Sequence, residues 1–393
     1  MPEPELGQLR HATAYIDRAA LRQNAKLAQS LAPQAQMLCM VKAEAYGHGM
    51  LEVARVLEPL ADAFGVARLQ EGILLRDSGC NRKIVLFSHH FTAQDFALAK
   101  KYKLTPGLFA QHNIAEQINC CCDAGLHYWL KLDTGMHRLG LPTHEHDSFE
   151  LAVANADRAS EHCDAVITHL HSADANDLDS AEKQLQTFNH AVAGMHIDLL
   201  NTRYSIANSA ALLQHTTAAQ RAKWLRDHIG SLPEHNEIIR PGIMLYGADP
   251  LACANTVSRL LKPVMTLAAP VIDLKRVPRG ASVGYAADWV AKQDSVIATV
   301  AIGYGDGYPR HAPNGTPVLI NGALGALAGR VSMDMIGVDI TALLEHGHKV
   351  KIGDPATLWG NGLAVEGVAD KAATISYQLL TGVTQRVERL YIN

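Results

Sequence analysis

The sequence predicts an α/β protein in which a (β/α)8 barrel is followed by a mostly β domain. Two observations lead to this prediction. Eight short β-rich runs alternate with segments of helical periodicity over about 230 residues, a size that suits a closed parallel barrel. After about residue 255 the long helical periods stop, and short apolar runs are separated by Gly, Pro, Asn and Asp. We expect the barrel to cover residues 13–257 and the β domain residues 258–393, joined by residues 1–12.

The eight β-rich runs define the expected barrel strands. In chain order they are QMLCMV (36–41), AFGVA (63–67), KIVLFS (83–88), LTPGLF (104–109), HYWLKL (127–132), CDAVITH (163–169), RYSIA (203–207) and EIIRPG (237–242). An open doubly wound sheet is the alternative, and its dinucleotide fingerprint requires G-x-G-x-x-G after the first strand. The segment AEAYGHG after the first run does not supply it, so the closed barrel is favoured.

Helical spacing fills the gaps between the runs. After the first run, apolar residues recur at the i, i+3, i+4 and i+7 positions of one helix face, namely Val53, Val56, Leu57 and Leu60. Similar spacing predicts helices over 93–102, 111–119, 145–157 and 180–193.

The second part shows a different pattern. Strands are predicted by VMTLAAPVIDLKRV, SVIATVAIGYG, TPVLING, GALAGRV and RVERLYIN. AVEGVADKAA (364–373) predicts the one helix of this domain. Because no repeat or low-complexity linker separates the two parts, we expect a tight junction between them.

Composition favours a small molecule as the ligand. The formal charge of −4 includes no dense Lys/Arg block, which argues against a nucleic acid or an anionic membrane as partner. The chain has no stretch of about 18 apolar residues and no basic start followed by an apolar run, so we expect a cytoplasmic protein. Seven cysteines, three of them consecutive at 120–122, suit neither a disulfide framework nor a zinc site. Reduced thiols and no metal are expected.

Lys42 stands at the end of the first β-rich run, where a barrel has its active-site mouth. A lysine crowded there by apolar walls can lose its proton and form an imine with an aldehyde cofactor. The alternative is a strand-end lysine whose amine reaches solvent or a salt bridge. Just beyond it, Tyr46 and the turn Gly47-His48-Gly49 can offer a hydroxyl and free N–H groups to a phosphate.

Two later strand ends carry charged residues. KLDTGMHRLG (131–140) offers a lysine, an aspartate and an arginine beside a glycine turn, with a surface pair between Lys131 and Asp133 as the alternative. His169 ends the sixth run within THLHS. Because side chains two residues apart in a strand point in opposite directions, His169 and His171 are not expected to share a metal ion.

The last two strand ends favour an anion. NSA (208–210) follows the seventh run and offers a serine with backbone N–H groups. In RPGI (240–243), Gly242 lets the backbone approach an anion closely. Each of these segments is also compatible with an ordinary turn.

The order of the motifs is specific to one family. Over nearly the whole chain the sequence carries, in order, MVKAEAYGHG, KLDTGMHRLG, THLHSAD, ANSA, RPGIMLYG, VGYAADW, IGYGDGYPR, GRVSMD and ISYQLL. In this the chain resembles the alanine racemases. The resemblance implies a pyridoxal 5′-phosphate enzyme that interconverts L- and D-alanine and supplies D-alanine for peptidoglycan. It also implies a head-to-tail homodimer in which the partner's β domain completes each active site.

The resemblance assigns two acid–base catalysts to opposite faces of the substrate Cα. Lys42 holds the cofactor as an internal aldimine. Once the substrate amine has replaced it in an external aldimine, the freed Lys42 amine acts on one face of Cα, and the partner subunit's Tyr285, in VGYAADW, acts on the other face. One group that removes and returns a proton on the same face would only regenerate the starting enantiomer. Arg240 matches the residue at the pyridine nitrogen, which stays unprotonated because a guanidinium cannot hand over its proton. Glu237 is close to Arg240 in sequence, but we expect its side chain at another depth of the barrel, so the role is assigned to Arg240.

The resemblance also implies the surroundings of the cofactor. The expected phosphate cradle consists of Tyr46, Ser209, Gly242, Ile243 and Tyr377. Arg138 is expected to bind the phenolic oxygen of the cofactor and the substrate carboxylate. Lys131, which is carbamylated in many relatives, is expected to hold Arg138 in place, because the carbamate turns repulsion between the two side chains into attraction.

Three further residues complete the implied site. His169 is expected to link Tyr285 to Arg240 through hydrogen bonds. Tyr304 and Met333 match residues that the partner subunit places at the substrate carboxylate and the pocket wall.

Three features depart from the family pattern. Glu44 stands where the family usually has Asn, and His171 where smaller or apolar residues are more usual. Residues 214–237 form a longer connection between Ser209 and Arg240 than the family typically needs. That segment predicts either an extra helix near the mouth or a surface elaboration without catalytic meaning.

Other activities on a similar barrel agree less well with the sequence. A broader amino-acid racemase is the near alternative, although Tyr377 beside the substrate methyl favours a small pocket. A basic amino-acid decarboxylase has an acidic residue where this chain has Arg240. A pyridoxal-phosphate-binding homeostasis protein has one domain, whereas this chain continues well beyond residue 258 and includes Tyr285.

Overall fold

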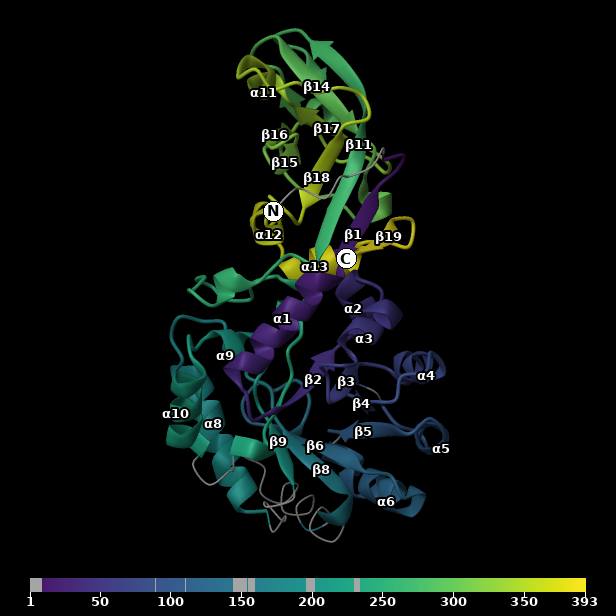
Figure 1. Cartoon of the computed structure of the whole chain (residues 1–393), viewed down its shortest axis with the longest axis vertical. Coiled ribbons are helices and arrows are strands. Elements are labelled where there is room, and N and C mark those ends of the chain that lie inside the picture. Colours follow the sequence, from purple (N-terminus) through teal and green to yellow (C-terminus); the bar gives the residue numbers. More distant parts are fainter. Residues whose placement is uncertain are drawn as a thin grey trace.

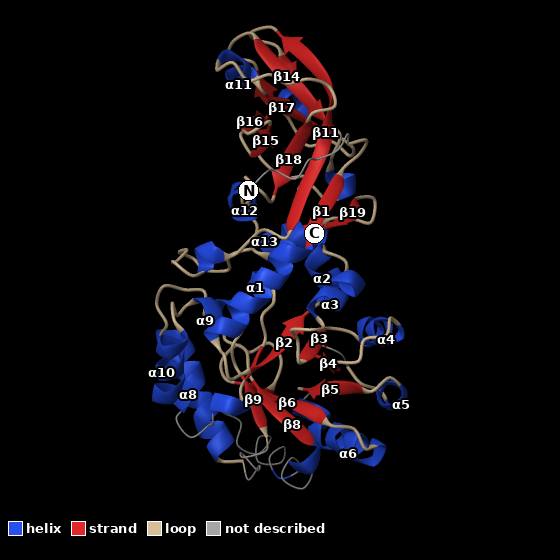
Figure 2. Cartoon of the chain, in the orientation of Figure 1, coloured by secondary structure: helices blue, strands red, loops and turns tan. Residues whose placement is uncertain are grey.

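The computed structural model shows a barrel and a β domain joined end to end (Figure 1). It describes residues 9–88, 90–109, 111–143, 154, 160–195, 202–229 and 234–393. In Figure 2 the barrel strands occupy the lower part of the view, with helices around their outside, and the second group of strands occupies the upper part. The predicted fold class is confirmed.

Eight parallel strands form the barrel, in the order β10-β2-β3-β4-β5-β6-β8-β9. Their bounds are β2 Gln36–Met40, β3 Ala63–Val66, β4 Lys83–Leu86, β5 Leu104–Leu108, β6 Tyr128–Asp133, β8 Cys163–Ile167, β9 Arg203–Ser205 and β10 Ile238–Ile239. A short strand β7 (Leu141–Pro142) pairs with β6. The sheet closes where Tyr204 of β9 bridges to Glu237, directly before β10. Each of the eight barrel strands overlaps one predicted run, so the eight predictions are confirmed, whereas β7 was not predicted.

The helices of the barrel follow its strands. Their bounds are α1 Arg18–Leu31, α2 Lys42–Gly47, α3 Met50–Leu57, α4 Leu69–Asp77, α5 Ala93–Lys101, α6 Ile114–Ala124, α8 Asp179–Ala193, α9 Ser209–Leu213 and α10 Ala218–Ile229. Short 3-10 helices are η1 Gln111–Asn113, η2 Ser160–His162, η3 Glu234–Asn236 and η4 Ile243–Tyr246. The periodic segments are confirmed by α3, α5, α6 and α8. The predicted helix 145–157 lies outside the described residues except for Ala154.

Local chemistry explains where these elements begin and why they were visible in the sequence. The carboxylate of Asp17 accepts the N–H groups of Ala19 and Ala20 at 2.8 and 2.9 Å and so caps the start of α1. Parallel strands covered on both faces need continuous apolar sequence. Trp129 and Leu130 of β6 are buried, for example, although they are neighbours in the chain.

The β domain is a closed ring of six strands with two more strands attached. The ring order is β14-β17-β16-β15-β18-β11, and pairing of β11 with β14 closes it. The bounds are β11 Met265–Val277, β14 Ser295–Val300, β15 Pro317–Ile320, β16 Ala323–Leu327, β17 Ile336–Asp339 and β18 Pro355–Trp359. The attached strands are β1 Thr13–Asp17, antiparallel to β11, and β19 Glu388–Ile392, parallel to β1. The remaining elements are β12 Ser282–Val283, β13 Trp289–Val290, α11 Thr341–Glu345, α12 Val365–Lys371, α13 Ser376–Gly382, η5 Ser258–Leu260, η6 Tyr285–Ala287 and η7 Tyr304–Asp306.

The structure corrects two expectations about the β domain. The helix predicted at 364–373 is confirmed by α12, but α11 and α13, of five and seven residues, are helices as well and were not predicted. Residues 13–17, expected in the barrel, pair with β11 and β19 instead. Their partners lie at least 249 positions later in the chain, so local sequence did not reveal the pairing. The domain boundary at residues 257 and 258 stays a prediction.

The two domains meet at the turn that follows Lys42. In Figure 1, α13, β1 and β19 lie at the junction. A Cβ built on Gly47 would come within 2.0 Å of the carbonyl oxygen of Leu380 in α13. From β19, Arg389 Nε donates to the Gly47 carbonyl at 3.2 Å, and Tyr391 Oη donates to the His48 carbonyl at 3.1 Å. The expected tight junction is confirmed.

The segment 214–237 contains a helix, α10, but the helix does not lie at the mouth. Arg221 of α10 forms a buried ion pair with Glu237, at the N-terminal end of β10 and so at the opposite end of the barrel from Lys42. Trp224 Nε1 donates to Glu182 Oε1 of α8 at 3.2 Å. Of the two alternatives, the helix near the mouth is therefore wrong, and the position of α10 agrees with the favoured one, a surface elaboration. The helix follows the barrel wall instead, because its polar groups find partners in α8 and before β10.

Three further findings concern membrane-spanning helices, metal sites and the cysteines. None of the described helices combines the length and the apolar character needed to cross a membrane. The described residues contain no group of three or more His, Cys, Asp or Glu side chains arranged to hold a metal ion. All seven cysteines are free.

Candidate active site

The candidate residues of the barrel meet at the C-terminal ends of its strands, where parallel barrels place their active sites. Five of them share one space: Lys42, Lys131, Arg138, His169 and Arg240. Burial and then the charges of the other four lower the pKa of His169 to about 3. His169 is therefore neutral at physiological pH.

Lys42 has an environment that favours a neutral amine. Burial lowers the pKa of Lys42, the Arg138 guanidinium lowers it further, and Glu71 opposes both effects. The neutral amine is the form that attacks an aldehyde. This electrostatic setting supports the imine-forming interpretation over a solvated strand-end lysine.

The turn after Lys42 has an unusual backbone. Four consecutive residues, Ala43, Glu44, Ala45 and Tyr46, have φ between 52° and 55° and form one left-handed turn. For residues with a side chain this conformation costs roughly 1–2 kcal/mol each. Sequence reasoning missed it, because KAEAYG has the residue types of an ordinary helix.

The left-handed turn places Tyr46 deep in the site. Its ring stacks on Tyr246 with 4.8 Å between the centroids, and the ring of Tyr377 lies 6.0 Å away. A Cβ built on Gly242 would lie 2.5 Å from Tyr46 Oη. Only glycine at position 242 leaves that hydroxyl its place.

The predicted anion cradle is assembled around Ser209. Ser209 Oγ accepts the N–H groups of Gly242 at 2.8 Å and Met244 at 3.4 Å. Ile243 lies between these two residues at the start of η4. The structure thus brings together all five predicted cradle residues: Tyr46, Ser209, Gly242, Ile243 and Tyr377.

Arg240 is held rigidly behind this space. Its guanidinium donates to the Thr168 carbonyl at 2.6 Å and to Ser205 Oγ, which in turn donates to the Ile238 carbonyl. Burial lowers the pKa of Arg240 to about 10, while Glu237 raises it, so the side chain stays cationic at neutral pH. Sequence reasoning missed Thr168 and Ser205, whose roles depend on contacts between different strands.

Lys131 does not form the surface pair that was the alternative. The carboxylate of Asp133 accepts the backbone N–H groups of Gly135 and His137, each at 3.0 Å, and so shapes the loop that leads to Arg138. Burial, and then the charges of Arg138 and Arg240, lower the pKa of Lys131 to about 8. A fraction of this amine is therefore neutral near physiological pH.

Three predicted residues lie on the β domain and remain largely open to solvent. Tyr285 is 67% exposed, Met333 53% and Tyr304 39%. Tyr304 and Met333 belong to one local structure, because the N–H of Gly305 donates to the Met333 carbonyl at 2.9 Å. The charged groups that shift the pKa of Lys42 are Arg138 and Glu71, and Tyr285 of the same chain is not one of them.

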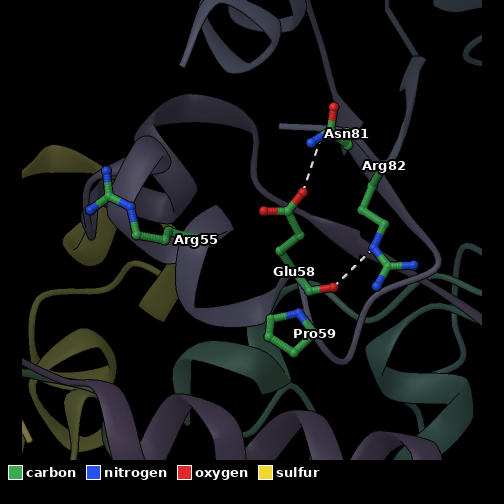
Figure 3. Close-up of a pocket in the computed structure, with 5 residues that line it drawn as sticks. All are labelled: Arg55, Glu58, Pro59, Asn81 and Arg82. Carbon is green, nitrogen blue, oxygen red and sulfur yellow. Dashed lines mark hydrogen bonds between the residues drawn. The ribbon is translucent and has the colours of Figure 1, made fainter. Parts of the chain in front are cut away.

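A polar hollow on the barrel is separate from this site. It has a volume of about 450 Å³ and is lined by Arg55, Glu58, Pro59, Asn81 and Arg82 (Figure 3). These residues precede β3 and β4 or end α3, so the hollow lies at the N-terminal ends of the strands. Glu58 accepts the Asn81 N–H with its side chain and Arg82 Nε with its carbonyl, both at 3.0 Å. Asn81 and Arg82 thus pair with Glu58, and Arg55 pairs with Glu52 of α3, so we assign the hollow no function.

Comparisons with known proteins cover both domains. The family model "Alanine racemase, N-terminal domain" matches residues 16–250, and "Alanine racemase, C-terminal domain" matches residues 264–391. The chain is 41% identical over 387 residues to the biosynthetic alanine racemase of Pseudomonas aeruginosa, which covers 98% of this chain and 99% of that protein. It is 37% identical over 383 residues to the biosynthetic alanine racemase of Escherichia coli, with 97% and 99% covered.

Solved structures agree with the sequence comparisons. The crystal structure of the Pseudomonas aeruginosa biosynthetic enzyme superposes with a TM-score of 0.83 at 39% identity, over 98% of this chain and 100% of that one. The alanine racemase of Bartonella henselae, described with covalently bound pyridoxal phosphate, superposes with a TM-score of 0.83 at 27% identity, over 97% and 99%.

Proposed function

The chain belongs to the alanine racemase family, and from this premise we propose how its site interconverts L- and D-alanine. Relatives of 37–41% identity over nearly the full length support alanine racemase activity. The match to the C-terminal family model counts against a single-domain homeostasis protein. We further propose that the enzyme supplies D-alanine for peptidoglycan and works in the cytoplasm.

The donor set at the strand ends fits pyridoxal 5′-phosphate. Lys42 offers an amine whose pKa is lowered, and Ser209, Gly242 and Ile243 surround a position suited to a phosphate beside the Tyr46 hydroxyl. A side chain at position 242 would fill this cradle. When bound there, the cofactor withdraws electrons from the substrate Cα and so acidifies its proton. We propose that Lys42 holds the cofactor covalently.

Two proton-transfer groups act in this proposal. Lys42 removes or returns the Cα proton on one face of the substrate, and the partner subunit's Tyr285 does so on the other. Each conversion between the enantiomers needs one group to take a proton and the other to give one, so both are required in either direction. In this scheme Tyr377, whose ring lies 6.0 Å from that of Tyr46, stands beside the substrate methyl and favours a small side chain.

Arg240 and His169 keep the surroundings of the cofactor fixed. The Arg240 guanidinium would bind the ring nitrogen of the cofactor and, because it retains its own proton, would leave that nitrogen unprotonated. The three oxygen atoms that bind Arg240, from Thr168, Ser205 and Ile206, prevent it from turning away. His169 is neutral and can both donate and accept, which suits its proposed place between Arg240 and Tyr285.

Lys131 is proposed to act as a carbamate. Its neutral amine adds to carbon dioxide and loses a proton, which converts a cation into an anion. The lowered pKa of Lys131 supports this step, because only the unprotonated amine reacts. The anion then attracts Arg138, which we propose binds the substrate carboxylate. Without the carbamate, Lys131 and Arg138 are two cations in one partly buried space.

We propose a homodimer with shared active sites. The observation that supports it is the exposure of Tyr285, Tyr304 and Met333 on the β domain, although the proposed reaction needs them at the substrate. A second copy that presents these residues to the barrel of the first copy satisfies the requirement.

The observation that carries the proposed function is the convergence of Lys42, with its lowered pKa, on a cradle closed by Gly242 and Tyr46. Purified protein with the cofactor bound to a lysine should absorb at about 420 nm. Because racemisation makes equal amounts of the two enantiomers, the circular dichroism of an L-alanine solution should fall to zero over time. Borohydride reduction followed by peptide mapping should place the pyridoxyl group on Lys42. A label on Lys131 would overturn the assignment of Lys42, and absence of both optical signals would overturn the function.

Tyr285→Phe should give a defect on one face only. Because the phenol serves one face of Cα, the variant should fail to exchange the α-proton of L-alanine for deuterium while Lys42 still exchanges that of D-alanine. Proton NMR in deuterium oxide measures both rates. Equal loss of exchange from the two enantiomers would show that Tyr285 has only a structural role.

A further inference from the structure

We propose that Glu71 is a positioning residue that holds the backbone turn presenting Lys42, an inference that rests on the role proposed above for Lys42. Glu71 lies in the first turn of α4, on the strand unit next to Lys42. Neither the motifs of the chain nor the family comparison assigned it a function.

The carboxylate of Glu71 connects two neighbouring loops of the barrel mouth. Its Oε1 accepts the N–H of Ala43, directly after Lys42, at 2.8 Å. Its Oε2 accepts the N–H groups of Ala67 at 2.7 Å and Arg68 at 2.9 Å, at the start of α4. A single side chain thus ties the loop after β2 to the loop after β3.

The turn needs such an anchor because its backbone is intrinsically unfavourable. Ala43 is the first of the four left-handed residues, each at a cost of roughly 1–2 kcal/mol, and an unfavourable backbone persists only where its surroundings hold it. At the far end, Arg389 and Tyr391 bind the carbonyls of Gly47 and His48. At the end next to the lysine, the Ala43 N–H binds Glu71.

Charge adds to this geometry. Burial and the Arg138 guanidinium lower the pKa of Lys42, and the Glu71 carboxylate raises it. Lys131 and His169 face the same space, and the charge of Lys42 lowers the pKa of each. Glu71 thereby limits how far the pKa of Lys42 falls in a largely cationic site.

Glu71→Gln tests both effects on the full-length protein. Glutamine keeps one accepting oxygen but offers N–H groups where Ala67 and Arg68 need an acceptor, and it has no charge. Hydrogen–deuterium exchange of the peptide containing Ala43 should become faster in the loaded enzyme. In protein stripped of cofactor, competitive acetylation of Lys42 measured against pH should shift its midpoint down by about 1 unit.

A matched control comes from α5, the next helix along the barrel. Asp95 occupies the equivalent first-turn position of α5 and accepts the Thr92 N–H at 2.8 Å. Asp95→Asn should leave both the exchange around Ala43 and the acetylation midpoint of Lys42 unchanged. If it moved them as much as Glu71→Gln does, the effect would be general loss of helix capping and the proposal would be wrong.

Glu71→Asp separates position from charge and keeps the test valid if glutamine prevents folding. The shorter carboxylate retains its charge but cannot span both loops, so exchange near Ala43 should rise while the acetylation midpoint moves less than with glutamine. If the folded variants kept both the hydrogen–deuterium exchange near Ala43 and the acetylation midpoint of Lys42 unchanged, the proposed role of Glu71 would be overturned. If wild-type Lys42 took no pyridoxyl label, the proposed function itself would fail, which is a separate outcome.

Discussion

Lys42→Ala is expected to lower racemase activity by at least about 10³-fold, because one substitution removes both the covalent attachment of the cofactor and one of two proton-transfer groups. Tyr285→Phe should also be inactive in racemisation. Mixing the two inactive proteins and allowing subunits to exchange should restore activity. In a mixed dimer one site carries both substitutions and the other carries neither, provided that the two groups come from different chains.

The size of the recovery follows from counting sites. Random exchange makes about half of the dimers mixed, and each has one intact site, so about a quarter of wild-type activity is expected if the sites act independently. Affinity tags on the two variants should first verify that mixed dimers form. With mixed dimers present and no recovered activity, both groups would have to come from one chain. That result would refute shared sites but leave racemase chemistry intact.

Arg221→Met is expected to destabilise the protein by about 3–5 kcal/mol, because it leaves the Glu237 carboxylate buried without its cationic partner. Arg221 is 4% exposed and Glu237 2% exposed, and the two side chains form a direct ion pair. Glu237 also bridges to Tyr204 where the barrel closes. Urea unfolding at a fixed protein concentration, monitored by tryptophan fluorescence, measures the decrease in the free energy of unfolding.

The same helix provides the control for this prediction. Lys223 pairs with Asp227 at 2.6 Å on the open side of α10, where both side chains are exposed. Lys223→Met should cost no more than about 0.5 kcal/mol. The double variant Arg221→Met with Glu237→Leu should recover much of the loss, since it removes the unpaired charge. Equal effects of Arg221→Met and Lys223→Met would contradict the assignment of a stabilising buried pair.

The barrel could be predicted because its strands are covered on both faces. Burial on both sides requires continuous apolar runs, such as Tyr128 to Leu130 in β6, and such runs are visible in a single sequence. Residues 13–17, which form β1, were included in the expected barrel without a strand being predicted there. The neighbours of β1, strands β11 and β19, are distant in the chain, and no local pattern contains that information.

The site was predictable to the extent that position along a strand determines it. Lys42, His169 and Arg240 follow strand ends, and the barrel brings strand ends together whatever the residues between them. Their roles came from the family resemblance and remain proposals. Glu71 was not predicted, although its place three residues after Arg68 matches a helix-capping position. A carboxylate that caps its own helix gives no sign in the sequence that it also binds a neighbouring loop.

The pairing of β1 with β19 has a consequence for the order in which a growing chain can complete its structure. Thr13 is among the first described residues to be synthesised, yet it pairs with Glu388, near the other end of the chain. The same late strand supplies Arg389 and Tyr391, which bind the turn after Lys42. A chain that has made the whole barrel but not β19 would therefore hold the turn after Lys42 through Glu71 at one end and would still lack the Arg389 and Tyr391 contacts at the other. On this basis, we expect the turn after Lys42 to gain its full set of contacts only once β19 has paired with β1.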